Sequence, residues 1–158
     1  MIAEIVQYPN GMGTERQELV TAARAVAFTA RRLERALDDM TLPQFRVLAI
    51  VASSSERASR IAERAAVSRP SLTGLLDGLE SRGWVRRVDV SGDRRGVRLE
   101  VTAAGTTALA EAEVAMAGAL SDLLGVTTSG ERSRAVKGLT SLGEILRAAR
   151  ARETAGAR

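Results

Sequence analysis

Residues 59–102 read SRIAERAAVSRPSLTGLLDGLESRGWVRRVDVSGDRRGVRLEVT, and this stretch decides the fold. Apolar residues recur at helical spacing from Ile61 to Ala65, and this pattern ends at a predicted turn at Val67 and Ser68. Leucines at helical spacing follow the turn. Two strand-like stretches then flank a turn at Ser91, Gly92 and Asp93. A short helix, a turn, a second helix and an Arg-tipped hairpin predict a winged helix-turn-helix, in which the second helix enters a DNA groove.

Positive charge is concentrated in the same stretch. Residues 57–98 contain ten Arg against five Asp and Glu, a local net charge of +5, whereas the whole chain carries +4. The rest of the chain therefore sums to −1. The excess lies where a contact with nucleic acid requires it.

Helix boundaries can be read from capping signals. Three Thr-x-x-Gln/Glu capping boxes begin at Thr14, Thr41 and Thr128, and Ser59 and Ser68 are placed to cap the two helices between them. Gly83 stands where the second of these should end. Alternation over residues 97–101 predicts a half-buried strand paired with a strand near residues 84–90. Thr102 should open a long helix. The fold class is mainly α with a small β-hairpin wing.

The sequence suggests a DNA-binding domain flanked by segments with other roles. We expect residues 1–13 to form a flexible N-terminal arm and residues 41–102 to form the DNA-binding winged helix. The Ala- and Leu-rich helices over residues 14–40 and 103–152 would leave apolar surface exposed in a single chain. We expect them to interleave with a second copy as dimerisation helices.

The composition excludes several functions. Among the 158 residues there is no Cys and no His, which excludes disulfides, thiol redox switches, Cys/His zinc sites and His-based acid–base catalysis. No glycine-rich phosphate loop or nucleophile–base signature occurs, so we expect no enzyme, no cofactor and no metal site. No apolar run approaches the roughly 20 residues of a membrane span. The N-terminus lacks the basic region of a signal peptide, so the expected location is cytoplasmic.

Several motifs resemble the MarR family of bacterial transcriptional regulators. They are TLPQFRVLAIV at 41–51, the stretch 59–85, the DRR of the wing and the following VT-x-x-G, and the resemblance spans about residues 14–150. Its most specific part is the Asp-x-Arg of Asp93 and Arg95, followed by Val101 and Thr102. The resemblance implies a dimeric DNA-binding regulator that binds a pseudo-palindromic operator in double-stranded DNA. Family members are commonly repressors released by a small, often aromatic or phenolic, ligand.

The resemblance also assigns candidate DNA contacts. It makes residues 68–81 the recognition helix and Arg95 the wing-tip residue. The candidates are Ser68, Arg69, Ser71 and Thr73 on the helix and Arg94 and Arg95 in the wing. Asp93 would repel phosphate, so we expect it to pair with an Arg and support the wing. Arg86 and Arg87 either reach the DNA backbone or simply face solvent.

An effector pocket would lie between the dimerisation helices and the winged helix. Its candidate lining residues are Phe28, Arg31, Arg32, Phe45, Arg46 and Trp84. The alternative is that the aromatic residues pack in the core and the Arg residues form salt bridges. One departure bears on function, because Gly74 and Gly78 stand where relatives often carry a basic residue. A winged-helix protein-interaction module without DNA binding therefore remains the alternative function. Operator, effector identity and repression against activation stay open.

Overall fold

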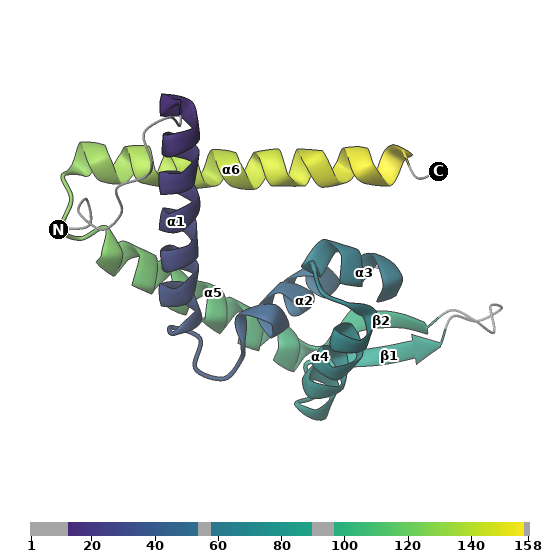
Figure 1. Ribbon diagram of the computed structural model, residues 1–158. Helices are drawn as coiled ribbons and strands as arrows, with labels where there is room; N and C mark the ends of the chain where they lie inside the picture. Colours follow the sequence, from purple (N-terminus) through teal and green to yellow (C-terminus); the bar gives the residue numbers. More distant parts are fainter. Residues whose placement is uncertain (1–12, 54–57, 90–96, 157–158) are drawn as a thin grey trace.

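The computed structural model describes residues 13–53, 58–89 and 97–156, which form helices and one hairpin (Figure 1). In chain order the elements are α1 (Thr14–Glu34), α2 (Leu42–Ser53), α3 (Ala58–Ala65), α4 (Arg69–Ser81), β1 (Val85–Asp89), β2 (Val97–Val101), α5 (Ala103–Leu123) and α6 (Ser129–Gly156). The predicted fold class is confirmed. None of the helices in these ranges has the length and apolar character needed to cross a membrane.

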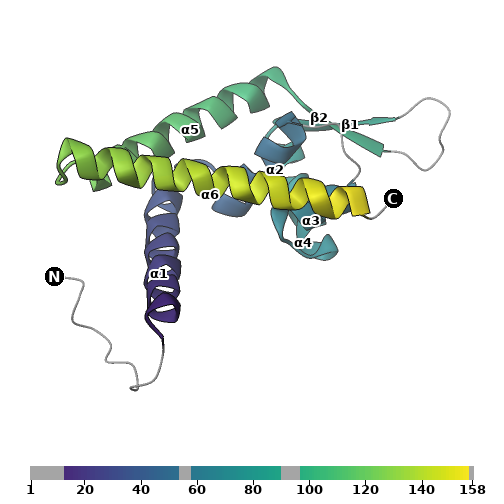
Figure 2. The same cartoon turned by 90° about the horizontal axis from the view of Figure 1, so that it is seen from above.

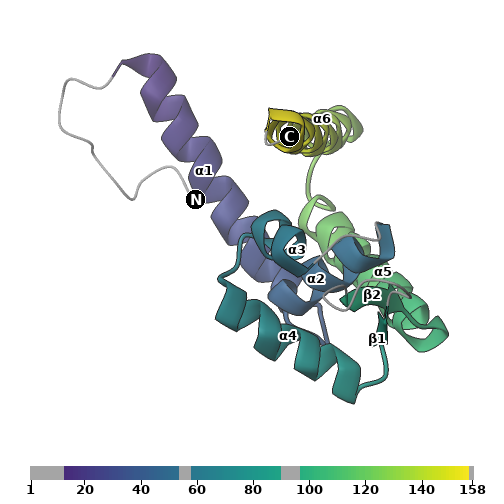
Figure 3. The ribbon, with the colours of Figure 1, turned by 90° about the vertical axis from the view of Figure 1, so that its right-hand side faces the viewer.

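The elements form a compact group with two projecting helices. Helices α2, α3 and α4 and the hairpin lie together, and α5 runs from this group toward α6 (Figure 1). Helix α1 projects from the group, and α6 lies apart from it in the views of Figures 1 and 3, although it crosses in front of the group in the view of Figure 2. Helix α4 is therefore held by the compact group, with α1 and α6 outside it.

The hydrophobic core belongs mainly to the winged helix. Its most deeply buried large side chains are Val47 and Leu48 of α2, Ile61 of α3 and Leu79 of α4. Helix α5 adds Ala112 to this cluster, and no residue of α6 among those whose side chains the structure describes belongs to it. The winged helix thus has its own core, whereas α6 has no buried face within a single chain.

The hairpin alternates between a core face and an outer face. Its strands are antiparallel, with Arg87 opposite Leu99 and Arg86 opposite Glu100. Val85 of β1 and Leu99 of β2 are buried, so the face of the hairpin that they share packs on the core. The alternate residues of each strand point outward. Arg87 lies on the same face of the hairpin as Val85 and Leu99, and Arg86 lies on the opposite, outer face.

Two of the three predicted capping boxes are confirmed. The Thr41 N–H donates to Gln44 Oε1 at 2.9 Å, and the Thr128 N–H donates to Glu131 Oε2 at 2.9 Å. The box at Thr14 was wrong, because Gly13 is the N-cap and makes no side-chain cap bond. The reason is that the Arg16 and Gln17 N–H groups donate to the Gly13 carbonyl, which places Thr14 inside the first turn.

The other helix ends follow the predictions with three exceptions. Helix α1 ends at Glu34, short of the end of the predicted range 14–40. Helix α3 begins at Ala58, so Ser59 lies within the helix and was wrongly predicted as its cap. Helix α6 continues to Gly156, beyond the predicted end at residue 152. The predicted arm, apart from Gly13, lies outside the described residues.

A Schellman turn connects α4 to β1. The Trp84 N–H donates to the Leu79 carbonyl at 2.9 Å and the Gly83 N–H to the Glu80 carbonyl at 2.8 Å. Gly83 has φ +69°, the left-handed conformation that this turn requires and that glycine adopts without strain. The base of the hairpin is therefore fixed directly to the end of α4.

Candidate nucleic-acid interface

The first turn of α4 presents small hydroxyl groups to solvent. Ser68 caps the helix by accepting the Ser71 N–H at 3.2 Å, and the two hydroxyls lie 2.7 Å apart. The Thr73 hydroxyl donates to the Arg69 carbonyl at 3.2 Å. Each hydroxyl therefore has a partner in its own helix and keeps lone pairs on the exposed surface. Ser68, Ser71 and Thr73 can accept from a ligand without unwinding the helix.

Arg69 is the cation of this turn. It is exposed at the first residue of α4, and its guanidinium makes no ion pair with any residue of the described ranges. The first N–H groups of a helix also carry positive partial charge. Arg69 and the start of α4 together form a surface suited to an anion such as phosphate.

The Arg residues of the hairpin strands differ from Arg69, because each lies beside a carboxylate. Arg86 Nη2 lies 2.8 Å from Glu100 Oε2, and Arg98 Nη2 lies 3.4 Å from Glu100 Oε1. Arg87 reaches α4, with Nη2 at 3.0 Å from Asp77 Oδ1 and Nη1 at 3.2 Å from Glu80 Oε2. The three guanidinium groups thus face three carboxylates, so this part of the wing adds little net charge.

Three of the predicted site residues belong to the wing tip. Asp93, Arg94 and Arg95 fall within residues 90–96, outside the described residues. Their assignments as wing support and DNA contacts stay predictions.

The two glycines of α4 have different surroundings. A Cβ at Gly74 would meet no atom within 4 Å, whereas a Cβ at Gly78 would lie 3.2 Å from Gln44 Nε2 of α2. Gly74 therefore leaves a bare patch on the exposed surface of α4. Gly78 lies against the start of α2, where a longer side chain would have to displace Gln44.

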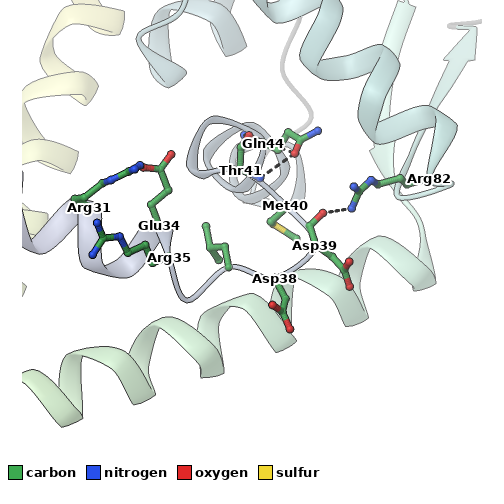
Figure 4. Close-up of a pocket in the computed structure, with 10 residues that line it drawn as sticks. Arg31, Glu34, Arg35, Asp38, Asp39, Met40, Thr41, Gln44 and Arg82 are labelled. Carbon is green, nitrogen blue, oxygen red and sulfur yellow. Dashed lines mark hydrogen bonds and ion pairs between the residues drawn. The ribbon is translucent and has the colours of Figure 1, made fainter.

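A pocket lies beside the end of α1 (Figure 4). It has a volume of about 380 Å³, and its lining residues are Arg31, Glu34, Arg35, Leu37, Asp38, Asp39, Met40, Thr41, Gln44 and Arg82. Arg82, which follows the last residue of α4, donates to the Asp39 carbonyl, and its guanidinium lies 4.8 Å from the Trp84 ring centroid. The pocket is mostly polar, and it connects the loop after α1 to the end of α4.

The structure does not gather the six predicted effector residues in this pocket, since only Arg31 lines it. Arg31 also pairs with Glu34 at 2.9 Å. Phe45 and Trp84 are half-buried against the core, which fits the alternative of core packing. Phe28 is 75% exposed, and Arg32 and Arg46 are exposed too. The effector site stays a prediction.

Sequence reasoning missed two long-range contacts. It left Arg87 between the DNA backbone and solvent, and it did not single out Arg82. The useful signal for Arg87 was its strand parity with the core face, together with Asp77 and Glu80 one turn apart on α4.

The comparison with family models matches residues 38–96, from the loop before α2 into the hairpin, to the MarR family. The matched segment is the winged-helix part of the chain, and this part is similar to the MarR family. The match covers the helices that carry Ser68, Arg69, Ser71 and Thr73. It confirms the resemblance found in the sequence.

Curated relatives with sequence similarity are HTH-type transcriptional regulators. FarR of Neisseria gonorrhoeae is 32% identical over 96 residues, which cover 60% of this chain and 60% of FarR. YfiV of Bacillus subtilis, an uncharacterized regulator, is 40% identical over 65 residues, or 40% of this chain and 41% of YfiV. The matches thus span less than two thirds of these relatives.

Solved MarR-family structures share the fold over most of the chain. Wild-type MarR of E. coli in the apo form has a TM-score of 0.67 at 22% identity, covering 84% of this chain and 98% of that one. Rv2887 of Mycobacterium tuberculosis, in complex with salicylic acid, has a TM-score of 0.66 at 22% identity, with the same two coverages. The winged-helix architecture is therefore shared at low sequence identity.

Proposed function

We propose that this chain is a sequence-specific DNA-binding transcriptional regulator that acts as a homodimer in the cytoplasm. Helix α4 would enter the major groove with its first turn leading, and the wing would contact DNA beside it. The observation that carries the proposal is Arg69, an exposed cation without an ion-pair partner among the described residues, at the start of a capped helix.

The side chains of the first turn of α4 are suited to hydrogen bonding with the edges of DNA bases. Arg69 can donate two parallel hydrogen bonds to guanine or to a phosphate. Ser71 and Thr73 keep acceptor lone pairs after satisfying their own helix, so they can accept from base amino groups. Their short side chains allow the helix backbone to approach closely.

Dimerisation is supported by the distribution of exposed apolar side chains. The large hydrophobic residues exposed in the described parts of a single chain are Leu19, Val26, Phe28, Val114, Leu123, Val126, Val136, Leu139, Leu142, Ile145 and Leu146. All of them lie on α1, on α5 and α6, or between the last two helices. Monomers rarely expose so much apolar surface on neighbouring elements. A second copy that covers these helices would place two α4 helices on one DNA duplex.

We further propose repression relieved by a small aromatic or phenolic anion. Rv2887, which shares the fold, is described in complex with salicylic acid. An anion of that class needs a cation near the junction of α1 and the winged helix, and Arg31 of the pocket supplies one. Release requires that the ligand bind the DNA-incompetent conformation more tightly than the competent one.

The central experiment is a mobility-shift titration on DNA from upstream of the chain's own gene, with Arg69→Gln and Arg16→Gln compared. Arg16 is an exposed Arg near the start of α1, remote from α4 in Figure 1, so its variant loses the same charge elsewhere. We expect Arg69→Gln to weaken binding by roughly tenfold or more and to reduce the salt slope by about one. Equal losses in both variants would contradict a role for the start of α4.

A second candidate function has one observation in its favour. Gly74 leaves bare an exposed position on α4 where a basic side chain would strengthen a DNA contact. A winged helix used for protein interaction would tolerate this loss. Absence of binding to every fragment of the gene's own locus, even at low salt, would favour that function over DNA binding.

A further inference from the structure

Arg87 joins the middle of the wing to the recognition helix. Its two terminal nitrogens point to different carboxylates, at 3.0 Å from Asp77 Oδ1 and 3.2 Å from Glu80 Oε2. Residues three apart on a helix lie on the same face, so a single planar guanidinium can bind both. This pair of contacts is specific to the fork of an Arg side chain.

The contacts lie at a second point along the hairpin. The Schellman turn already fixes the base of the hairpin, because the Trp84 N–H is bonded to the Leu79 carbonyl. Arg87 follows three residues later, on the strand face that packs on the core. Together with the packing of Val85 and Leu99 on the core, these two attachment points fix the direction of the hairpin relative to α4.

We propose that Arg87 is a positioning residue, which holds the wing at a fixed angle to the recognition helix by binding Asp77 and Glu80. The inference rests on the proposed DNA binding for its functional consequence. A fixed angle means that α4 and the wing meet the two grooves in one register, and this favours a matched operator over other sequences. Arg86 and Arg98 share Glu100 within the hairpin and do not reach α4.

Two explanations of Arg87 predict opposite signs for the carboxylate variant Asp77→Asn/Glu80→Gln. If Arg87 were a phosphate contact weakened by its acidic neighbours, removal of two negative charges would tighten binding to every DNA. If Arg87 positions the wing, the same change releases the hairpin and reduces discrimination between DNAs. The pairs are part-exposed, at 46% for Arg87, 59% for Asp77 and 25% for Glu80, so global stability should change little.

The experiment compares the full-length wild type with Asp77→Asn/Glu80→Gln, Arg87→Gln and the matched control Arg86→Gln. Arg86 is the neighbour on the same strand and loses the same charge, while Glu100 keeps Arg98. The first measurement is the ratio of affinities for DNA from the gene's own upstream region and for a scrambled duplex of equal length. The second is hydrogen exchange of the backbone amides of the paired strands in DNA-free protein.

We expect the carboxylate variant and Arg87→Gln to lower the affinity ratio by roughly three- to tenfold, and to speed exchange in the strands. Arg86→Gln should leave strand exchange as in the wild type. Tighter binding to both duplexes with unchanged exchange in the carboxylate variant would overturn the proposal. If the wild type binds no DNA, the proposed function fails. In that case, hydrogen exchange of the strands still tests whether Arg87 holds the hairpin in position. Unchanged exchange in Arg87→Gln would reject that role.

Discussion

Gly105 provides a sharp test of how α5 meets the winged helix. It is the third residue of α5, it is buried, and its N–H donates to Thr102 Oγ1 at 3.0 Å. A Cβ built at Gly105 would lie 2.0 Å from the Trp84 carbonyl oxygen and 2.8 Å from its carbon. These are backbone atoms, so no side-chain movement can relieve the overlap. Gly105→Ala must therefore shift α5 away from the turn between α4 and β1.

The cost follows from the contacts that such a shift would break. Thr102 donates from its hydroxyl to the Gly83 carbonyl at 2.6 Å and from its N–H to the Trp84 carbonyl at 3.0 Å. Loss of two such bonds costs about 1–3 kcal/mol and overpacking adds about 1–3 kcal/mol, against a gain in helix propensity of about 1 kcal/mol. We expect Gly105→Ala to lower the free energy of unfolding by about 1–5 kcal/mol.

Gly74→Ala is the matched control, because Gly74 lies inside α4 and a Cβ there meets nothing within 4 Å. It should raise stability by up to about 1 kcal/mol. The assay is urea unfolding of both variants and wild type at one protein concentration, since the stability of a dimer depends on concentration. If Gly105→Ala were as stable as Gly74→Ala, the close approach of α5 to Trp84 would be refuted.

Three further predictions concern other parts of the chain. Hydrogen bonds from the Thr128 side chain, and then from its backbone N–H, stabilise the Glu131 carboxylate and hold its pKa below its ordinary value of 4.5. The stabilisation of the first turn of α6 by these bonds is therefore present above pH 4.5 and is lost as the pH falls through the lowered pKa. A carboxyl titration by NMR checks this, and titration at or above 4.5 would contradict it. Arg82→Ala removes the bond to the Asp39 carbonyl and the contact with Trp84, and should cost about 0.5–1.5 kcal/mol in thermal unfolding, partly recovered by Arg82→Lys. An unchanged Tm would show that neither contact stabilises the fold. Leu142→Asp/Ile145→Asp should dissociate the proposed dimer in sedimentation velocity, with Glu144→Gln as the control, and a dimeric double variant would reject α6 as the interface.

The sequence predicted elements well where the signal is local. The boxes at Thr41 and Thr128 form as expected, because each needs only side chains three residues apart. The same pattern failed at Thr14, where Gly13 takes the cap with ψ 150° and the Thr enters the helix. A Thr-x-x-Gln pattern does not specify which residue leaves the helical conformation. Backbone geometry outside the motif decides that.

Contacts between distant residues were beyond the sequence pattern. The turn between α4 and β1 could be predicted from Gly83, but not that Thr102 and Gly105 would pack on it from the start of another helix. The VT-x-x-G motif contains the two residues that make this packing, Thr102 and Gly105, but the sequence alone does not show what they contact. The structure supplies the reason, since Thr102 both caps α5 and holds the Gly83 carbonyl, and residue 105 has no room for a Cβ.

These contacts imply that the winged helix moves as one body when its flanking helices move. The start of α5 is bonded to the turn after α4, and Arg82 at the end of α4 is bonded to the Asp39 carbonyl in the loop after α1. Arg87 then connects α4 to the hairpin. A displacement of α1 or α5 is therefore passed to α4 and the wing together, because each attachment ends on backbone or on a two-point ion pair. In the proposed dimer, we expect a proposed effector that shifts α1 or α5 to change the spacing of the two α4 helices without deforming either winged helix.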